Sequence, residues 1–238
     1  MTRTVLLVDD EPEITELLRL FLEQAGLAVL EAHDGEEAWS LIESGRPVHL
    51  AVVDIMMPRL DGSELLKRLR ARHRLPVILL SAKNADTDKI LGLYLGADDF
   101  IAKPFNPLEV VARVQALLRR AYDFGGEAAA AGTEETVRIG DLALDRRECA
   151  VTKQGEPVEL TALEYKLLEV FMSSPGRIFT KQQLFERVWA DYYHEDANTV
   201  MVHISRLRGK IEDHPKQPLY IRSVRGIGYK FARREEFP

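Results

Sequence analysis

The sequence predicts two domains: an α/β domain built on a five-stranded, doubly wound parallel sheet over residues 1–120, and a smaller α+β domain over residues 136–238. Short β-branched runs alternate with amphipathic stretches in the first part, whereas the second has short strands, three helices and a closing hairpin. Residues 121–135 lack hydrophobic periodicity and contain three glycines, so we expect a linker there. With 46% hydrophobic residues, both parts have enough apolar side chains for a core.

The elements of the first part follow from its apolar runs. Strands are expected at Val5–Val8, Leu27–Leu30, Leu50–Val53, Val77–Leu80 and around Phe100 and Ile101. Helices are expected at Ile14–Gln24, Gly35–Ile42, Gly62–Arg70, Asp86–Leu95 and Pro107–Arg120. Several of the strands are almost wholly apolar, as is typical of strands that are covered on both faces.

The second part begins with alternating strands near Val137–Ile139, Leu142–Leu144 and Ala150–Lys153. Two helix starts match the capping box, Thr161-x-x-Glu164 and Thr180-x-x-Gln183. Pro175-Gly176 follows the first of these helices, and the second runs over Lys181–Trp189. A third helix at residues 198–212 and a Gly-containing hairpin over 220–231 complete the domain.

Charge is distributed unevenly along the chain. The net charge is -6, yet residues 198–234 contain nine basic and two acidic side chains, a pattern that attracts phosphate backbones. The apolar runs are too short to span a membrane, and the N-terminus has no signal peptide pattern, so we expect a cytoplasmic protein. The lone Cys149 rules out an internal disulfide bond.

Polar side chains follow the expected strands at one edge of the first sheet. Asp9 and Asp10 follow the first strand, Asp54 ends the third, Ser81 ends the fourth and Lys103 follows the fifth. Each alone has a structural explanation, such as a helix cap or a turn. Together, three carboxylates in one crevice would repel each other unless a cation such as Mg²⁺ lay among them. A hydroxyl and an ammonium beside them would bind a phosphoryl group.

The blocks LLVDDE, VVDIMMPRLDG, LLSAK and GADDFIAKPF resemble those of bacterial response-regulator receiver domains, which have a flavodoxin-like fold. The resemblance covers residues 3–120 and implies that Asp54 accepts a phosphoryl group from a sensor histidine kinase. It implies that Mg²⁺ is held by Asp9, Asp10, Asp54 and the Met56 carbonyl. Lys103 and Ser81 would bind phosphoryl oxygens, Phe100 would be the switch residue, and the Lys103-Pro104 bond would be cis.

The same resemblance implies a symmetric homodimer once the domain is phosphorylated. Its ion pairs would join Lys89 to Glu109, Asp99 to Arg113 and Asp98 to Arg120. Its apolar patch would comprise Ile90, Leu93 and Val111. From the sequence alone these charges also fit an ordinary solvated helix face, because single surface pairs contribute only about 0 to 1 kcal/mol.

The helix expected at residues 198–212 has two distinct stripes. Apolar residues at spacings of 4, 3 and 4 predict one buried stripe, formed by Val200, Ile204, Leu207 and Ile211. A neighbouring stripe, expected to be exposed, comprises Thr199, His203, Arg206 and Lys210. Such a helix has the size and polarity of a helix that reads the DNA major groove, with Arg225 in the hairpin positioned for the minor groove.

Residues 136–231, through TVMVHISRLRGKIE and YIRSVRGIGYKF, resemble the winged helix-turn-helix output domain of osmoregulation and phosphate-starvation regulators. The stretches NTVMVHI and PLYIRSVRGIGYK are most similar to those of vancomycin-resistance regulators. The resemblance implies that Val202, His203 and Arg206 contact bases of promoter DNA. It implies that Thr199, Ser205 and Arg208 contact phosphates, with Arg225 in the wing. The loop Ala190–Ala197 would contact RNA polymerase. Many relatives have Arg in place of Asn198 and Asp in place of Met201, which alters one expected phosphate contact.

Three functions are compatible with these patterns. The first is a phosphorylation-gated, dimerising transcription regulator, which is not an enzyme. The second is a Mg²⁺-dependent phosphatase with Asp54 as its nucleophile, although Met56 stands where a second acid would be needed. The third is a DNA-binding scaffold whose first domain is no longer modified, which the complete set of site residues disfavours.

Overall fold

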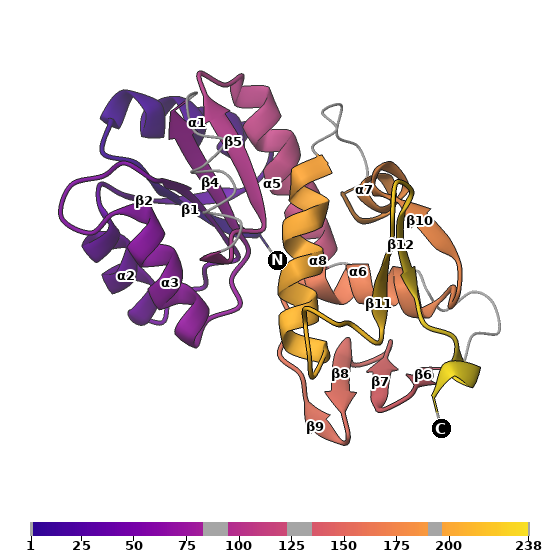
Figure 1. Cartoon of the computed structure of the whole chain (residues 1–238). Coiled ribbons are helices and arrows are strands. Elements are labelled where there is room, and N and C mark those ends of the chain that lie inside the picture. Colours follow the sequence, from indigo (N-terminus) through magenta and orange to yellow (C-terminus); the bar gives the residue numbers. More distant parts are fainter. Residues whose placement is uncertain (1, 83–94, 123–134, 190–196, 238) are drawn as a thin grey trace. The chain divides into compact units, whose positions relative to one another are not determined.

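The structure is a computed structural model that describes residues 2–82, 95–122, 135–189 and 197–237 (Figure 1). Contacts divide the chain into two compact units, Met1–Leu118 and Arg119–Pro238. The division falls within the last helix of the first domain, and the expected linker at 121–135 lies largely outside the described residues. The predicted domain boundaries stay a prediction.

The first unit contains a parallel five-stranded sheet in the order β2-β1-β3-β4-β5. The strands are β1 (Thr4–Val8), β2 (Ala28–Ala32), β3 (Leu50–Asp54), β4 (Val77–Ala82) and β5 (Asp99–Lys103). The helices are α1 (Pro12–Gln24), α2 (Gly35–Glu43), α3 (Gly62–Arg72) and α5 (Pro107–Tyr122). The predicted fold is confirmed, while the helix expected at 86–95 lies almost wholly outside the described residues.

The strand order determines which face of the sheet each early helix covers. The chain moves outward from β1 to β2 and then back past β1 to β3. Because such crossovers are right-handed, α1 lies on one face and α2 and α3 lie on the other, as Figure 1 shows. The central strands β1 and β3 are almost completely buried between these layers, and the carboxyl ends of all five strands share one edge.

Side-chain caps fix two of these helices. Asp34 begins α2 by accepting from the N–H groups of Glu36 and Glu37, and Asp61 begins α3 by accepting from the Glu64 N–H at 2.8 Å. Gly62 packs so closely beneath the end of β3 that a Cβ there would lie 2.1 Å from the Asp54 carbonyl oxygen. The connection from β3 to α3 is therefore held tightly against the strand that carries Asp54.

The described part of the second unit contains two antiparallel sheets, three α-helices and one short 3-10 helix. A four-stranded sheet is formed by β6 (Thr136–Ile139), β7 (Leu142–Asp145), β8 (Ala150–Lys153) and β9 (Glu156–Pro157). The helices are α6 (Ala162–Met172), α7 (Lys181–Trp189) and α8 (Ala197–Ile211). The second sheet contains β10 (Ile178–Thr180), β12 (Gly228–Phe231) and β11 (Ile221–Val224), followed by the short helix η1 (Arg234–Glu236).

The hairpin of β11 and β12, called here the wing hairpin, matches the predicted hairpin. Strand β10, which the sequence analysis did not predict, adds to it through β12. Both predicted capping boxes are present: the side chains of Thr161 and Glu164 exchange bonds with each other's backbone N–H, as do those of Thr180 and Gln183. These local signals explain where α6 and α7 begin.

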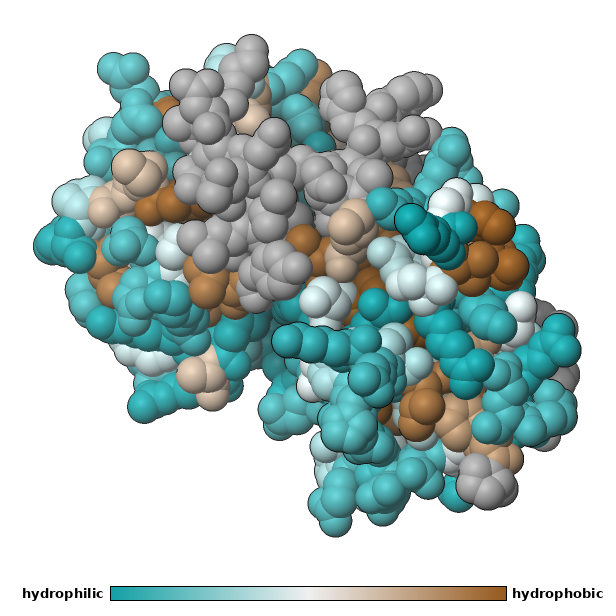
Figure 2. Space-filling view, in the orientation of Figure 1, coloured by the Kyte–Doolittle hydropathy of each residue, from teal (hydrophilic) through white to brown (hydrophobic). Residues whose placement is uncertain are grey.

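Hydrophilic residues cover most of the described surface in Figure 2, with hydrophobic residues in small groups between them. The large apolar side chains are mostly in the cores of the two units. Among the described helices, none combines the length and the apolar character that crossing a membrane would require.

Candidate functional site

Three carboxylates converge where the strands of the first sheet end. The pairing of Val8 with Val53 brings the ends of β1 and β3 side by side, so Asp9 and Asp10 lie next to Asp54. Carboxylate oxygens of these three residues lie within 4.8 Å of one another. Asp9 and Asp54 are buried, whereas Asp10 is exposed, so the cluster opens to solvent on one side.

The ammonium group of Lys103, at the end of β5, reaches into this cluster. Its Nζ lies 2.8 Å from Asp9 Oδ2 and 3.4 Å from Asp54 Oδ2. The bond that joins Lys103 to Pro104 is cis, as expected. Lys103 also donates to Glu11 Oε1 at 3.2 Å, a contact that the sequence did not predict. The lysine is thus a cation held among several carboxylates.

The surroundings of Asp54 raise the pKa of its carboxyl group. Burial raises the pKa of Asp54 to about 6; Lys103 lowers this pKa, while the charges of Asp9 and Asp10 raise it. Burial opposes the charge of Lys103, yet its bond to Asp9 and the charge of Asp54 raise the pKa of the ammonium group above its ordinary value. The positive charge of Lys103 does not offset the negative charges of all three carboxylates. An added divalent cation would therefore stabilise the ionised form of Asp54.

Two further predicted residues lie at the same edge. Ser81, near the end of β4, is 1% exposed, and its Oγ has no hydrogen-bond partner among the residues that the structure describes. Phe100 in β5 is also buried. Met56 lies in the connection that follows Asp54 and has a highly exposed side chain. A buried hydroxyl without a partner is costly, and an oxygen-rich ligand at this edge would give it one.

Four of the charged residues expected at a dimer interface form ion pairs within a single chain here: Asp98, Asp99, Glu109 and Arg113. Arg113 Nη1 donates to both Asp99 oxygens at 3.0 Å, and its Nη2 donates to Glu109 Oε1 at 2.7 Å. Asp98, expected to pair with Arg120, is buried and accepts from Arg70 Nη2 at 2.7 Å. The pairing between copies stays a prediction, and it would require these side chains to exchange or share partners.

The remaining residues of that expected interface lie on α5 or outside the described residues. Val111 is half-buried on α5, and Arg120 is buried. Lys89, Ile90 and Leu93 lie outside the described residues.

In the second unit, α8 has the buried stripe that its sequence spacing predicts. Val200, Ile204, Leu207 and Ile211 are all at most 1% exposed. The helix packs against α6 and α7, as Figure 1 shows. The apolar side of α8 is thereby fixed in the core of this unit.

The neighbouring stripe of α8 is not the exposed edge that the sequence analysis expected. Thr199 and His203 are at most 5% exposed, and the His203 ring lies edge-on to Trp189 with centroids 5.2 Å apart. Arg206 and Lys210 both form ion pairs with the buried Glu164 of α6. The expectation of exposure was wrong for Thr199 and His203, the latter covered by the Trp189 ring, whereas Arg206 is half-buried and Lys210 is exposed as expected. Val202, also expected to face bases, is 4% exposed.

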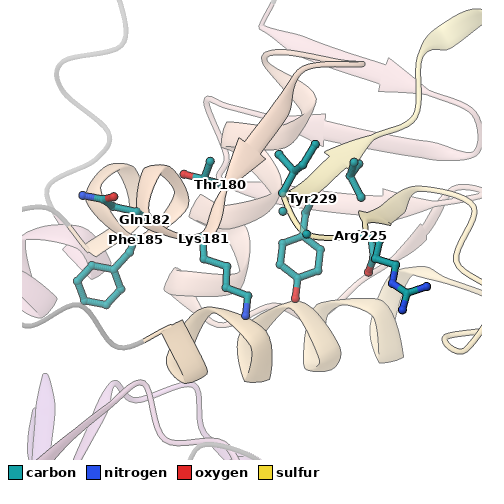
Figure 3. A pocket seen from close by; sticks show the side chains of 11 residues that line it. Thr180, Lys181, Gln182, Phe185, Arg225 and Tyr229 are labelled. Carbon is teal, nitrogen blue, oxygen red and sulfur yellow. The ribbon is translucent and has the colours of Figure 1, made fainter.

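A hollow of about 620 Å³ lies between the start of α7 and the wing hairpin (Figure 3). Lys181 and Tyr229 point from its walls toward α8, and Lys181 Nζ lies 3.0 Å from Met201 Sδ. Arg208 donates to the Ile221 carbonyl at 2.7 Å and lies over the Tyr229 ring.

One residue predicted to contact DNA lines this hollow, and another is exposed on α8. Arg225, in the turn of the wing hairpin, lines it and is exposed, and Ser205 on α8 is exposed as well. Of the loop expected to contact RNA polymerase, only Ala197 is within the described residues, as the first residue of α8. This region thus combines the exposed Arg225, the half-buried Lys181 and Arg208, and the start of α7.

Comparison with known proteins agrees with both halves of this geometry. Residues 5–115 match the response regulator receiver domain, and residues 155–231 match the C-terminal domain of transcriptional regulatory proteins. The chain belongs to the response regulators of two-component systems, and it combines a receiver domain with an OmpR-type DNA-binding domain.

Relatives support this assignment over the full length. The response regulator GtcR of Aneurinibacillus migulanus is 57% identical over 238 residues, covering 100% of this chain and 98% of that protein. The regulatory protein VanRc of Enterococcus gallinarum is 42% identical over 230 residues, covering 96% and 98%.

Two solved structures are also similar to this chain. DrrB of Thermotoga maritima, an OmpR/PhoB homologue, is 29% identical with a TM-score of 0.50, covering 98% of this chain and 100% of that chain. A cysteine-to-serine mutant of RitR shares the fold with a TM-score of 0.77 at 24% identity, covering 97% and 99%.

Proposed function

We propose that this response regulator accepts a phosphoryl group on Asp54 from a sensor histidine kinase, and that this modification controls binding to promoter DNA. The observation that carries the proposal is the cluster of Asp9, Asp10 and Asp54 within 4.8 Å, with the Lys103 ammonium 3.4 Å from Asp54. A buried carboxylate nucleophile, two supporting carboxylates and one cation are what acyl phosphate formation needs.

The residues present fit a Mg²⁺ ion, which when bound would offset the negative charge of the incoming phosphoryl group. Asp9, Asp10, Asp54 and the backbone carbonyl of Met56 would hold it. An Asp54 carboxylate oxygen attacks the phosphorus of a phosphohistidine, the P–N bond breaks, and the imidazole leaves. Lys103 binds one phosphoryl oxygen, and the Ser81 hydroxyl donates to another.

Phosphorylation would then shift the receiver between two conformations. The Ser81 contact would draw the end of β4 toward the phosphoryl group, and Phe100 would follow as the switch residue. We propose that the phosphorylated receiver forms a homodimer through Asp98, Asp99, Glu109, Arg113 and Arg120 with the patch that includes Val111. The pairs of Arg113 and Asp98 within the chain would rearrange in that step.

The second unit would bind double-stranded promoter DNA through α8 and the wing hairpin. Contacts are proposed for Thr199, Val202, His203, Ser205, Arg206, Arg208 and Arg225, with RNA polymerase contacted through the loop before α8. Exposed Ser205 and Arg225 support this assignment directly. The buried members would contact bases only after side chains on this face reorient. Because promoter DNA in bacteria lies in the cytoplasm, that is the proposed location.

The experiment that tests the acceptor is labelling with acetyl phosphate and Mg²⁺, followed by peptide mass spectrometry. The wild-type protein should gain one phosphoryl group on Asp54, and Asp54→Asn should gain none. Asp61→Asn is a matched control, because asparagine caps α3 as well as aspartate does. Stable labelling of Asp54→Asn would place the acceptor elsewhere, and rapid multiple turnover of phosphate esters would favour a phosphatase.

A further inference from the structure

The carboxylate of Glu164, at the start of α6, makes contacts well beyond its role in the capping box. It is fully buried, and its Oε2 accepts from the Thr161 N–H at 2.9 Å. The same oxygen lies 2.6 Å from Lys210 Nζ, and Oε1 lies 3.1 Å from Arg206 Nη2. Since an isolated buried carboxylate is costly, these two cations of α8 are part of how Glu164 is accommodated.

The two cations lie one helical turn apart on the same stripe of α8. The Arg206 side chain is 11% exposed and that of Lys210 is 34% exposed. Burial alone would raise the pKa of Glu164, but the charges of Arg206 and Lys210 lower it below its ordinary value. Glu164 is therefore ionised at neutral pH, and it offsets one of the two positive charges at this place.

We propose that Glu164 is a positioning residue for DNA recognition: it orients the Arg206 guanidinium for base contact and limits the attraction of this stripe to phosphates. The inference rests on the proposed DNA-binding function of α8. It assigns to α6, which itself need not touch DNA, a share of the sequence preference.

Both effects follow from ordinary chemistry. A guanidinium is a planar fork of five donors, and the contact of Nη2 with Glu164 sets the orientation in which this fork would meet the paired acceptors of guanine. A side chain already fixed in the free protein loses less freedom on binding. Removing the negative charge of Glu164 would raise the net positive charge of this stripe by one and strengthen its attraction to any duplex, and phosphate contacts carry no sequence information.

The test compares Glu164→Gln with the wild-type protein on two duplexes. One duplex is selected by the wild-type protein from a random pool, and the other is a shuffled sequence of the same composition. Glutamine keeps the shape and an oxygen for the Thr161 N–H but lacks the charge. Affinity for the shuffled duplex should rise several-fold, preference for the selected duplex should fall about tenfold, and the log–log salt dependence should steepen by about one.

Controls separate positioning from a loss of folding. Glu156→Gln, an exposed carboxylate on β9, makes the same charge change and should leave the preference unchanged. Adding Lys210→Gln to Glu164→Gln should restore the wild-type salt dependence, which a structural defect would not do. Thermal melting establishes that each variant is folded.

Glu164→Asp provides a second arm, because it keeps the charge but is shorter. It should lower the preference and keep the wild-type salt dependence. The inference is overturned if folded Glu164→Gln or Glu164→Asp retains the wild-type preference, or if either loses affinity equally for both duplexes. If the wild-type protein itself shows no preference for any selected duplex, the proposed DNA function fails, which is a separate result.

Discussion

Lowering the pH from about 8 to about 5 should weaken Mg²⁺ binding to this protein about tenfold. Asp54 has a pKa of about 6, and it must be ionised to bind a divalent cation. At a pH about one unit below this pKa, roughly one molecule in eleven has an ionised Asp54, so the apparent affinity falls by about that factor. The sign follows from the raised pKa: affinity is flat above about pH 7 and falls below pH 6.

Isothermal titration of the full chain with Mg²⁺ across this pH range measures the effect. In Asp54→Asn no carboxyl proton competes with the metal at this position. This variant should bind Mg²⁺ more weakly, and its affinity should not show the step, that is, the fall in affinity near pH 6. Lys103→Met should move the step upward by about 1 to 3 pH units, because the ammonium at 3.4 Å favours the ionised carboxylate. An unchanged affinity between pH 8 and pH 5, or the same step in Asp54→Asn, would refute the reasoning.

Three other changes test the surrounding structure. Gly62→Ala places a Cβ 2.1 Å from the Asp54 carbonyl oxygen, so the free energy of unfolding of the first unit should fall by about 1 to 3 kcal/mol. A urea midpoint equal to that of the wild-type protein would contradict this, because it would mean that the backbone between β3 and α3 moves at no cost. Arg206→Ala should cost about 1 to 3 kcal/mol at one base pair in competition binding, and equal losses on selected and random duplexes would remove it from base reading. Arg208→Ala should weaken all duplexes alike and also lower the melting temperature of the second unit, because its guanidinium bonds to the Ile221 carbonyl; a loss confined to one sequence would contradict this.

The position of the carboxylate cluster could be predicted from the sequence because carboxyl ends of parallel strands share one edge. Asp9, Asp54 and Lys103 each stand at or just after the end of an apolar run, and the end of such a run marks the carboxyl end of its strand. The Glu11 contact could not be predicted, since nothing in a helix-start acid indicates a lysine 92 positions away.

The second unit shows the limit of periodicity. The spacing of Val200, Ile204 and Leu207 predicts which residues share a face, and all three are buried. Periodicity does not indicate what covers the next stripe, so the contacts of His203 with Trp189 were missed. A capping box likewise locates a helix start without indicating that its glutamate has further partners.

Partner choice among surface charges was the least predictable feature of the receiver. Arg113 has acceptors both four residues away in its own helix and on β5. Sequence identifies such a residue as charged and exposed, but competition between partners within one chain and in a second copy depends on distances that only coordinates provide.

The central claim is that one acyl phosphate on Asp54 changes how the protein binds DNA. The most direct test measures, on the same sample, sedimentation and affinity for a selected duplex before and after acetyl phosphate with Mg²⁺. The wild-type protein should become dimeric and bind the duplex more tightly, while Asp54→Asn should do neither. Equal affinity of modified and unmodified protein, with labelling at Asp54 verified, would contradict the claim.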